Sequence, residues 1–413
     1  MAKSGQYVVG LDIGTTTIRC VVVQVADDGG LGIIGLGDAP SRGLRKGLVV
    51  NPDATVDAIK SAVGTAELMA GVNIEQATVG IAGGHIRSFN SRGVITVTGK
   101  DHAVSREDLR RVMAAAQAVS IPHDREIVHV LVQEFVLDDQ GGITSPKGMI
   151  GSKLEANVHI ITASRTSVQN LVSCANRAGV EVRDTVVEQL AVSEAVLTTD
   201  EKELGVALLD IGGGTTDLAI FEKGSVWHTA VLPVGGDHFT NDLAVGLRTP
   251  IPDAERLKKK FGCALASMVD GNTTIEVQSV GGRKPRLLSL QIMSEILQPR
   301  ATEIFTLIHE EVARAGFGRS LNAGVVLSGG GSILPGMTEV AEQVFDLPVR
   351  RGVPTGVEGL AEPTSAPQFA TAIGLAMFGA HNQPRRQRLT VSVPVGSLGR
   401  MGDRFRAWFS EIF

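Results

Sequence analysis

The chain has 413 residues, a formal net charge of −5 and only 4% aromatic residues. This length can form two or three α/β domains with a large core. The negative balance gives no general attraction to nucleic acid, which we exclude as a partner. Three widely spaced cysteines indicate a reducing compartment, and no apolar run approaches the roughly 18 residues of a membrane span. We therefore expect a cytosolic protein that can touch a membrane without crossing it.

The first predicted element is a β-hairpin over residues 8–23, and nearly the same pattern returns over residues 206–220. In each copy an apolar run leads into Asp-Ile-Gly, a turn rich in glycine or hydroxyl residues follows, and a second apolar run completes the hairpin. The turn residues are Asp12, Gly14, Thr15, Thr16 and Thr17 in the first copy and Asp210, Gly212, Gly213, Gly214 and Thr215 in the second. This repetition indicates an internal duplication.

Both turns suit phosphate. Glycines let backbone N–H groups close around an anion, and we expect a φ above zero at Gly213. Asp210 and Asp217 would repel a bare phosphate, so their presence fits a hydrated Mg²⁺ between carboxylate and phosphate oxygens. The alternative is a glycine-rich hairpin without a ligand, which the duplication weakens.

A basic segment over residues 41–51 precedes a helix that apolar spacing predicts over 52–69. We interpret the basic segment as a solvated loop; the alternative is that it approaches the nucleotide cleft. His85 follows a second glycine turn, and we interpret it as a structural histidine with satisfied ring nitrogens.

Residues 86–162 change character and predict an inserted α+β unit. Strands are expected over 93–98, 126–137 and 154–162, and the capping box between Ser105 and Asp108 predicts the start of a helix. No residue in this unit looks suited to catalysis, so we expect it to make contacts.

A helix expected over 166–178 stops at Gly179, and the strand after it leads into Glu188. Ligands bind at strand ends in open α/β sheets, so Glu188 could orient a water toward a terminal phosphate. The alternative is an acid that interacts with the dipole at a helix N-terminus.

The second half carries further candidates for ligand contacts. Gly235 and Gly236 begin a helix whose backbone N–H groups favour anions. The basic helix over 252–262 is either a plain solvated face or a nucleotide contact. A third glycine turn, Gly329-Gly330-Gly331, follows a buried strand. A long helix expected over 290–315, interrupted at Pro299, comes after a basic loop.

The composition changes abruptly after Gly379. Residues 381–397 lack a core pattern and predict a flexible linker. The last segment, 398–413, predicts an amphipathic helix with arginines beside one apolar face. The residues expected to contact a membrane are Leu398, Met401, Arg404, Phe405, Trp408, Phe409 and Ile412. The alternative is a tail helix docked on its own protein.

These motifs together resemble the superfamily of actin, sugar kinases and heat-shock-chaperone ATPases. The two hairpins match its phosphate motifs and the third glycine turn its adenosine motif, while residues 187–191 and 370–376 match its connecting segments. The resemblance implies an α/β, actin-like two-lobed fold with a duplicated ATPase core that binds ATP and Mg²⁺. It implies phosphate contacts from both hairpin turns and from Gly235 and Gly236, and adenosine contacts from Glu255, Lys258, Lys259, Gly329, Gly330 and Gly331.

The same resemblance implies that Asp12 and Asp210 hold the metal through water and that Glu188 and Asp210 serve hydrolysis. Members often have Pro after the connecting-segment acid, where this chain has Gln189. We therefore expect ATP binding with slow or no hydrolysis.

Over nearly its whole length the chain resembles the FtsA family of bacterial cell-division proteins. The resemblance implies filaments on the cytoplasmic face of the membrane at the division site, where the chain would tether the ring of the tubulin-like protein FtsZ and recruit later division proteins through the inserted unit. It places the FtsZ C-terminal tail in the second lobe, where Arg283, Arg286 and Arg300 suit an acidic peptide. Alternatives are a small-molecule kinase and a pilus-assembly actin-like ATPase.

The expected organisation follows this resemblance. The first lobe comprises residues 1–85, 163–198 and 356–380; the inserted subdomain, 86–162; the second lobe, 199–355, with the FtsZ-binding part at about 226–300; the linker, 381–397; and the membrane helix, 398–413.

Overall fold

The computed structural model describes residues 6–99, 101–359 and 365–382. Its first five-stranded sheet has the order β11-β6-β1-β2-β3. The strands are β1 (Gln6–Ile13), β2 (Thr17–Val25), β3 (Leu31–Pro40), β6 (Gln76–Ile81) and β11 (Glu181–Val187). β1, β2 and β3 form an antiparallel meander, and β6 and β11 add parallel strands on the other side of β1.

The second five-stranded sheet repeats this plan with the order β18-β17-β12-β13-β14. Its strands are β12 (Val206–Ile211), β13 (Thr216–Glu222), β14 (Ser225–Leu232), β17 (Val325–Ser328) and β18 (Val349–Arg351). Again three strands form an antiparallel meander and two parallel strands extend it. Both predicted hairpins and the internal duplication are therefore confirmed.

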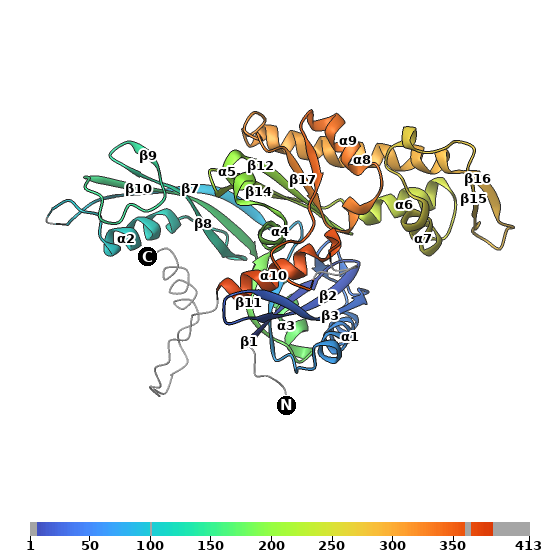
Figure 1. The fold of residues 1–413 in the computed structure, drawn as a ribbon, viewed down its shortest axis with the longest axis horizontal. Helices are drawn as coiled ribbons and strands as arrows, with labels where there is room; N and C mark the ends of the chain where they lie inside the picture. Colours follow the sequence, from blue (N-terminus) through green and yellow to red (C-terminus); the bar gives the residue numbers. More distant parts are fainter. Residues whose placement is uncertain (1–5, 100, 360–364, 383–413) are drawn as a thin grey trace.

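Helices pack on both sheets, and α4 (Glu188–Val196) and α10 (Ala370–His381) lie between the two lobes (Figure 1). In the first lobe α1 (Pro52–Ala70) packs on β2 and β3, whereas α10 packs on β1, β2, β6 and α4. α3 (Arg165–Arg177) lies beside α1. Close packing of α1 requires glycine in β3, because a Cβ on Gly37 would lie 1.9 Å from the carbonyl oxygen of Ala62.

The second-lobe helices bury Phe239, Ile304, Phe305 and other apolar side chains against the second sheet. They are α6 (Gly236–Gly246), α7 (Ile251–Phe261), α8 (Leu290–Arg314) and α9 (Met337–Phe345). The short helix α5 (Thr199–Leu204) lies beside β13 and buries none of its residues. α8 continues through Pro299, so the expected interruption is wrong. Leu297 and Ala301, on either side of Pro299, are fully buried, and this packing holds the turn despite the lost hydrogen bond.

The inserted unit extends away from both lobes, at the left of Figure 1. Its sheet has the order β7-β10-β8-β9, and α2 covers one face. Its elements are β7 (Arg87–Thr96), α2 (Arg106–Gln117), β8 (Arg125–Leu137), β9 (Gln140–Ile143) and β10 (Lys153–Ser164). The predicted capping box is present, since Ser105 accepts from the backbone of Asp108 and the Asp108 side chain accepts from the backbone of Ser105. β7 begins six residues earlier than expected.

Two small ribbons complete the described residues: β4 (Leu44–Arg45) with β5 (Leu48–Val49), and β15 (Thr274–Val277) with β16 (Arg286–Ser289). Short 3-10 turns span Ala266–Met268, Gly330–Ile333 and Pro367–Phe369. None of the helices within residues 6–99, 101–359 and 365–382 has both the length and the apolar character needed to cross a membrane.

Candidate functional site

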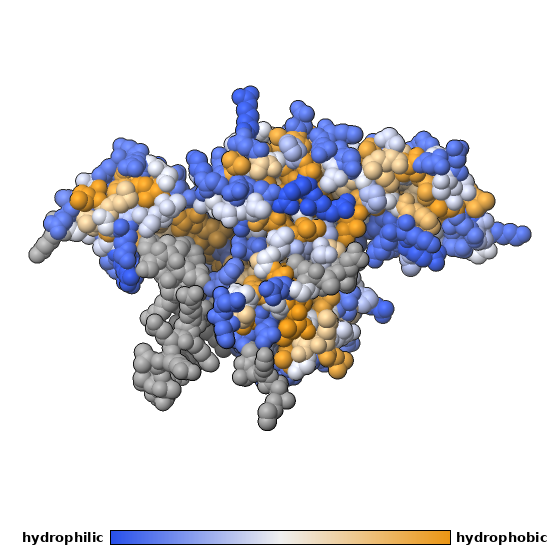
Figure 2. Space-filling view, in the orientation of Figure 1, coloured by the Kyte–Doolittle hydropathy of each residue, from blue (hydrophilic) through white to orange (hydrophobic). Residues whose placement is uncertain are grey.

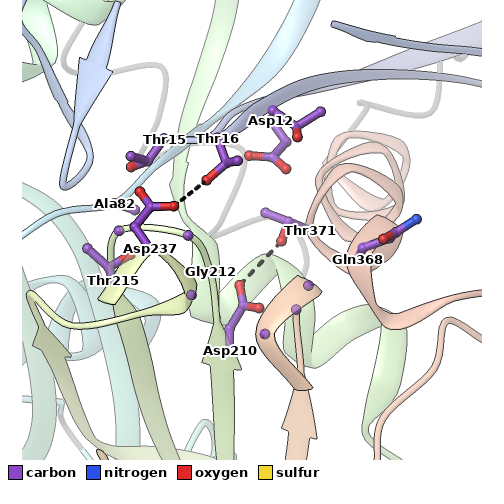
Figure 3. Close-up of a pocket in the computed structure, with 18 of the residues that line it drawn as sticks. Asp12, Thr15, Thr16, Ala82, Asp210, Gly212, Thr215, Asp237, Gln368 and Thr371 are labelled. Carbon is purple, nitrogen blue, oxygen red and sulfur yellow. Dashed lines mark hydrogen bonds between the residues drawn. The ribbon is translucent and has the colours of Figure 1, made fainter. Parts of the chain in front are cut away.

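A cavity of about 300 Å³ lies where the two hairpin turns meet (Figure 3). The first lobe contributes the β1–β2 turn, and the second contributes the β12–β13 turn, the glycine turn after β17, and α6 and α7. The predicted residues that line it are Asp12, Gly14, Thr15, Thr16, Thr17, Glu188, Asp210, Gly212, Gly213, Gly214, Thr215, Gly236, Glu255, Lys258, Lys259, Gly329, Gly330 and Gly331. Gly235 does not line it.

The turns of the two hairpins approach each other directly. A Cβ on Gly213 would lie 1.8 Å from Oγ1 of Thr16, and a Cβ on Gly214 would lie 2.8 Å from Oγ1 of Thr15. The φ of Gly213 is not in the left-handed region, so the expected φ above zero is wrong. Gly213 is required there because the other hairpin leaves no room for a side chain.

The third glycine turn closes the cavity from the side of β17. Gly329 has φ 78°, and its Cβ would lie 2.3 Å from Oδ1 of Asp210. A Cβ on Gly331 would lie 2.4 Å from Cγ2 of Ile211. Both backbone conformation and space therefore select glycine at this turn.

The start of α6 supports the second hairpin. The N–H of Gly236 donates to the carbonyl of Gly212 at 2.9 Å, and the N–H of Asp237 donates to that of Gly213 at 2.8 Å. The N–H of Gly235 donates to Nδ1 of His238. The expectation that these N–H groups favour an anion is therefore wrong, because they are already bonded within the protein.

α7 presents a charged group to the cavity mouth. Nζ of Lys258 lies 2.7 Å from Oε2 of Glu255 and donates to Oγ1 of Thr240 at 2.8 Å, while Lys259 pairs with Glu255 at 3.2 Å. The lysines hold the pKa of Glu255 below its ordinary value against the effect of burial. A negatively charged carboxylate here suits the hydroxyls of a sugar.

Asp12, Glu188 and Asp210 are among the acids that line the cavity, and Asp217 is the cross-strand partner of Asp210. Burial raises the pKa of Asp12 to about 6, and burial with repulsion from Asp12 raises that of Asp210 to about 7. Burial and the Asp210 charge raise the pKa of Asp217 to about 8. Burial and the three aspartates raise the pKa of Glu188 well above its usual range. A divalent cation near these carboxylates would offset both the cost of burying their charges and the repulsion between them.

The donor set fits a hydrated Mg²⁺ with a phosphate chain. Carboxylates from both lobes reach one cavity, a glycine cradle surrounds it, and Oδ1 of Asp217 is buried without a partner. Among the described residues no group of three or more His, Cys, Asp and Glu side chains has a geometry that would hold a bare metal ion. Contact through water, as expected for Asp12 and Asp210, is the arrangement that suits these residues.

The structure adds residues that the sequence pattern did not single out. Oγ1 of Thr16 donates across the cleft to Oδ1 of Asp237 at 3.4 Å, and Oγ1 of Thr371 donates to Oδ2 of Asp210 at 3.3 Å (Figure 3). Arg19 and Gln368 also line the cavity. Thr371 belongs to the connecting segment recognised in the sequence, which was the one available signal.

The basic segment 41–51 reaches the cavity. The N–H of Gly47 donates to Oγ1 of Thr15 at 3.0 Å, and Gly47 lines the wall. Arg42, Arg45 and Lys46 are exposed, but the interpretation of the whole segment as a solvated loop is wrong.

His85 also differs from its expected role. Both ring nitrogens are buried without a hydrogen-bond partner, so the histidine is not satisfied. Burial and the charges of Arg125 and Arg87 lower its pKa to about 4.

The three arginines expected to receive a partner tail lie in the second lobe and outside the cavity. Arg283 is exposed, and Arg286 donates to the carbonyl of Leu247. Arg300 is already paired with Asp242 at 2.6 Å and with Glu303. Figure 2 shows hydrophilic and hydrophobic residues side by side on the projecting end that carries β15 and β16. The predicted linker spans 381–397, but His381 still belongs to α10 and Asn382 caps that helix. The rest of the predicted linker, 383–397, and the predicted membrane helix, 398–413, lie outside the described residues.

Comparisons with known proteins agree with this architecture. The sequence profile for "Cell division protein FtsA" matches residues 207–374, and that for "SHS2 domain inserted in FTSA" matches residues 83–162. The cell division protein FtsA of Pseudomonas aeruginosa is 48% identical over 390 residues, which cover 94% of this chain and 93% of that protein. The FtsA of Neisseria meningitidis is 43% identical, with both chains covered completely.

Solved structures show the fold. A type IV pilus biogenesis complex of PilM and PilN has a TM-score of 0.67 at 17% identity, covering 91% of this chain and 99% of the other. MreB5 of Spiroplasma citri bound to ADP has a TM-score of 0.55 at 16% identity, covering 90% and 96%. These likenesses confirm the actin-like α/β fold, and the matched SHS2 domain confirms the insertion. The identity with relatives over the full length decides the family: this chain belongs to the FtsA family of bacterial cell division proteins.

Proposed function

We propose that this chain binds ATP with Mg²⁺ between its lobes, assembles into filaments on the cytoplasmic face of the membrane at the division site, and tethers the FtsZ ring there. The observation that carries the proposal is the cavity formed by two duplicated hairpin turns, one from each lobe, in a chain of the FtsA family. Solved MreB5 structures of the same fold are bound to ADP or AMPPNP, which supports a nucleotide as the ligand.

In this proposal the turns at Gly14–Thr17 and Gly212–Thr215 hold the phosphates, and Gly329–Gly331 lies under the nucleoside. Asp12 and Asp210 would hold Mg²⁺ through water, and the ion would supply positive charge that offsets the carboxylates and the phosphates. Glu255, with Lys258 and Lys259, meets the sugar. The raised pKa values of Asp12 and Asp210 support this assignment, because a bound cation favours their charged forms.

Slow or absent hydrolysis follows from the state of Glu188. Its carboxyl is buried, and burial together with the charges of three aspartates raises its pKa well above the ordinary value, which favours the protonated form. A protonated carboxyl cannot accept a proton from an attacking water. Glu188 is therefore a poor general base until a cation lowers the surrounding negative charge.

Attachment to the membrane would come from residues 398–413, which form an amphipathic helix in this proposal. Apolar side chains and nearby arginines suit an anionic lipid surface. One such helix binds reversibly, and assembly of many copies would multiply the attachment. The FtsZ tail would bind the second lobe at about 226–300, and later division proteins would bind the inserted subdomain at 86–162.

The test is sedimentation of the full chain with anionic vesicles, with and without MgATP and FtsZ. We expect the chain to pellet with vesicles, more strongly with ATP, and to bring FtsZ into the pellet. A chain that binds ATP but stays in the supernatant would contradict the tethering role, and one that shows no ATP binding by titration calorimetry would contradict the nucleotide site.

A further inference from the structure

Arg19, on β2, is a partly buried cation whose Nε has no hydrogen-bond partner. Its side chain is 18% exposed and lines the cavity, and Nη1 lies 3.8 Å from Oδ2 of Asp12, its cross-strand partner. The guanidinium also stacks over the ring of Phe369, 5.3 Å from the centroid. Nε is buried without a partner. At 3.8 Å the contact with Asp12 is an ion pair rather than a hydrogen bond. The guanidinium has five N–H donors, and this contact satisfies none of them with a hydrogen bond.

The two lysines that line this cavity already have partners within the protein. Lys258 bonds to Gly236, Thr240 and Glu255, and Lys259 pairs with Glu255. Both lie on α7 in the second lobe. Arg19 lies on the opposite side, next to the first hairpin turn and beside Gln368 and Phe369, which precede α10.

The position of Arg19 is fixed before any ligand arrives. Phe369 is 4% exposed and holds one face of the guanidinium, while the strand register sets Arg19 opposite Asp12. A planar guanidinium that is held in place loses little entropy on binding, and its paired N–H groups match two oxygens of one phosphate. Nε of Arg19 is a buried donor without a partner, and this carries a free-energy cost that an anionic ligand would remove.

We propose that Arg19 donates hydrogen bonds to the terminal phosphate of a bound nucleoside triphosphate and thereby makes the site prefer ATP to ADP. This inference rests on the proposed nucleotide site and deepens it. The selectivity arises because a diphosphate lacks the group that Arg19 would bind. The competing arrangement is that Arg19 only holds Asp12 in place and affects both nucleotides through the metal.

The experiment measures the affinities of the full chain for MgATP and MgADP by titration calorimetry. R19M keeps an unbranched side chain over Phe369 and removes the charge, whereas R19K keeps the charge and loses the paired donors. Arg350→Gln is the matched control, since Arg350 pairs with Glu201 outside the cavity. We expect R19M to lose about tenfold or more in ATP affinity and less than about threefold in ADP affinity, because a charge-assisted bond is worth on the order of a tenfold change. R19K should fall between R19M and the wild type.

Two results would overturn the inference. Equal losses of ATP and ADP affinity in R19M would show that Arg19 acts through Asp12. In that case the double variant R19M/D12N would lose no more affinity than D12N alone. Unchanged ATP affinity in R19M would show that Arg19 does not meet the ligand. If the wild-type chain binds neither nucleotide, the proposed site itself fails, and that failure appears before any variant is compared.

Discussion

Nε2 of His159 in the inserted subdomain lies 2.9 Å from Oγ1 of Thr229 in the second lobe. His159 is fully buried, and its Nδ1 lies 2.6 Å from Oδ1 of Asn90. Ser88 donates to the carbonyl of Thr229 at 2.7 Å, and Gln133 donates to that of Trp227 at 3.2 Å. The insertion, which leaves the first lobe after β6, is therefore fastened to β14 of the second lobe by polar contacts.

Replacing His159 with leucine should destabilise this junction. Asn90 and Thr229 would each lose a buried partner, so we expect the free energy of unfolding to fall by about 1–3 kcal/mol. Urea unfolding followed by circular dichroism measures this. His123→Leu, at an exposed position in the same subdomain, is the control and should change little.

The effect of His159 should also depend on pH. Burial lowers the pKa of His159 to about 3. Between pH 6.5 and pH 3 its imidazole is therefore protonated in the unfolded chain and neutral in the folded chain. The contribution of His159 to stability is thus fully present above pH 6.5 and falls as the pH drops. The difference between wild type and His159→Leu should shrink from pH 7 to pH 5; a constant difference would contradict the buried neutral state.

Gly213→Val should abolish nucleotide binding. Its first side-chain carbon would overlap Oγ1 of Thr16 and push the hairpin turns apart. Calorimetry with MgATP measures the loss. Gly64→Val, in a helical position where a Cβ would meet nothing within 4 Å, is the matched control. Unchanged ATP affinity in Gly213→Val would remove the phosphate assignment of this turn.

Asp217→Asn should stabilise the nucleotide-free protein at alkaline pH. Because burial and Asp210 raise the pKa of Asp217 to about 8, the folded chain holds a proton that the unfolded chain loses above pH 3.8, and stability falls as the pH rises toward 8. The amide carries no charge and can still accept from Thr215. We expect a gain of about 1–3 kcal/mol at pH 8.5, since each pKa unit is worth 1.36 kcal/mol. The gain should shrink steadily as the pH falls from 8.5 toward 4, and a gain that does not change with pH would have another cause.

Charge reversal in the second lobe should weaken binding of the FtsZ tail peptide, most strongly at low salt. Arg300→Glu is expected to do so, but it would also leave three acids together, because Asp242 and Glu303 already flank position 300. Arg283→Glu is the cleaner variant, since Arg283 is exposed. Fluorescence anisotropy at two salt concentrations measures both. If the affinity for the peptide changed neither with these substitutions nor with the salt concentration, the FtsZ tail would not bind at this part of the second lobe.

Deleting residues 398–413, or changing Trp408 to Glu, should abolish sedimentation with anionic vesicles and leave ATP binding intact. A buried aromatic side chain contributes about 1.5–3 kcal/mol to binding at the lipid surface, and an introduced carboxylate opposes it. Trp408 fluorescence in the wild type should shift to the blue when vesicles are added. Pelleting of the deleted protein would assign the membrane contact to another part of the chain.

The sequence by itself determined the elements whose signals are local. Glycines between two apolar runs specify the hairpins at Asp12 and Asp210, and Ser105 with Asp108 specifies the start of α2, because turns and caps depend on neighbouring residues. The repeated pattern of apolar runs around a turn also determined the two-lobed plan, because two copies of the same hairpin pattern form two sheets of the same kind.

Tertiary structure decided what depends on distant residues. α8 continues through Pro299 because buried neighbours hold it, and Gly213 must be glycine because of Thr16 in the other lobe. Thr16 and Asp237 are 221 positions apart, and His159 meets Thr229 across 70. No local pattern encodes such contacts, because they arise only when the packing of two sheets and the insertion brings those side chains together.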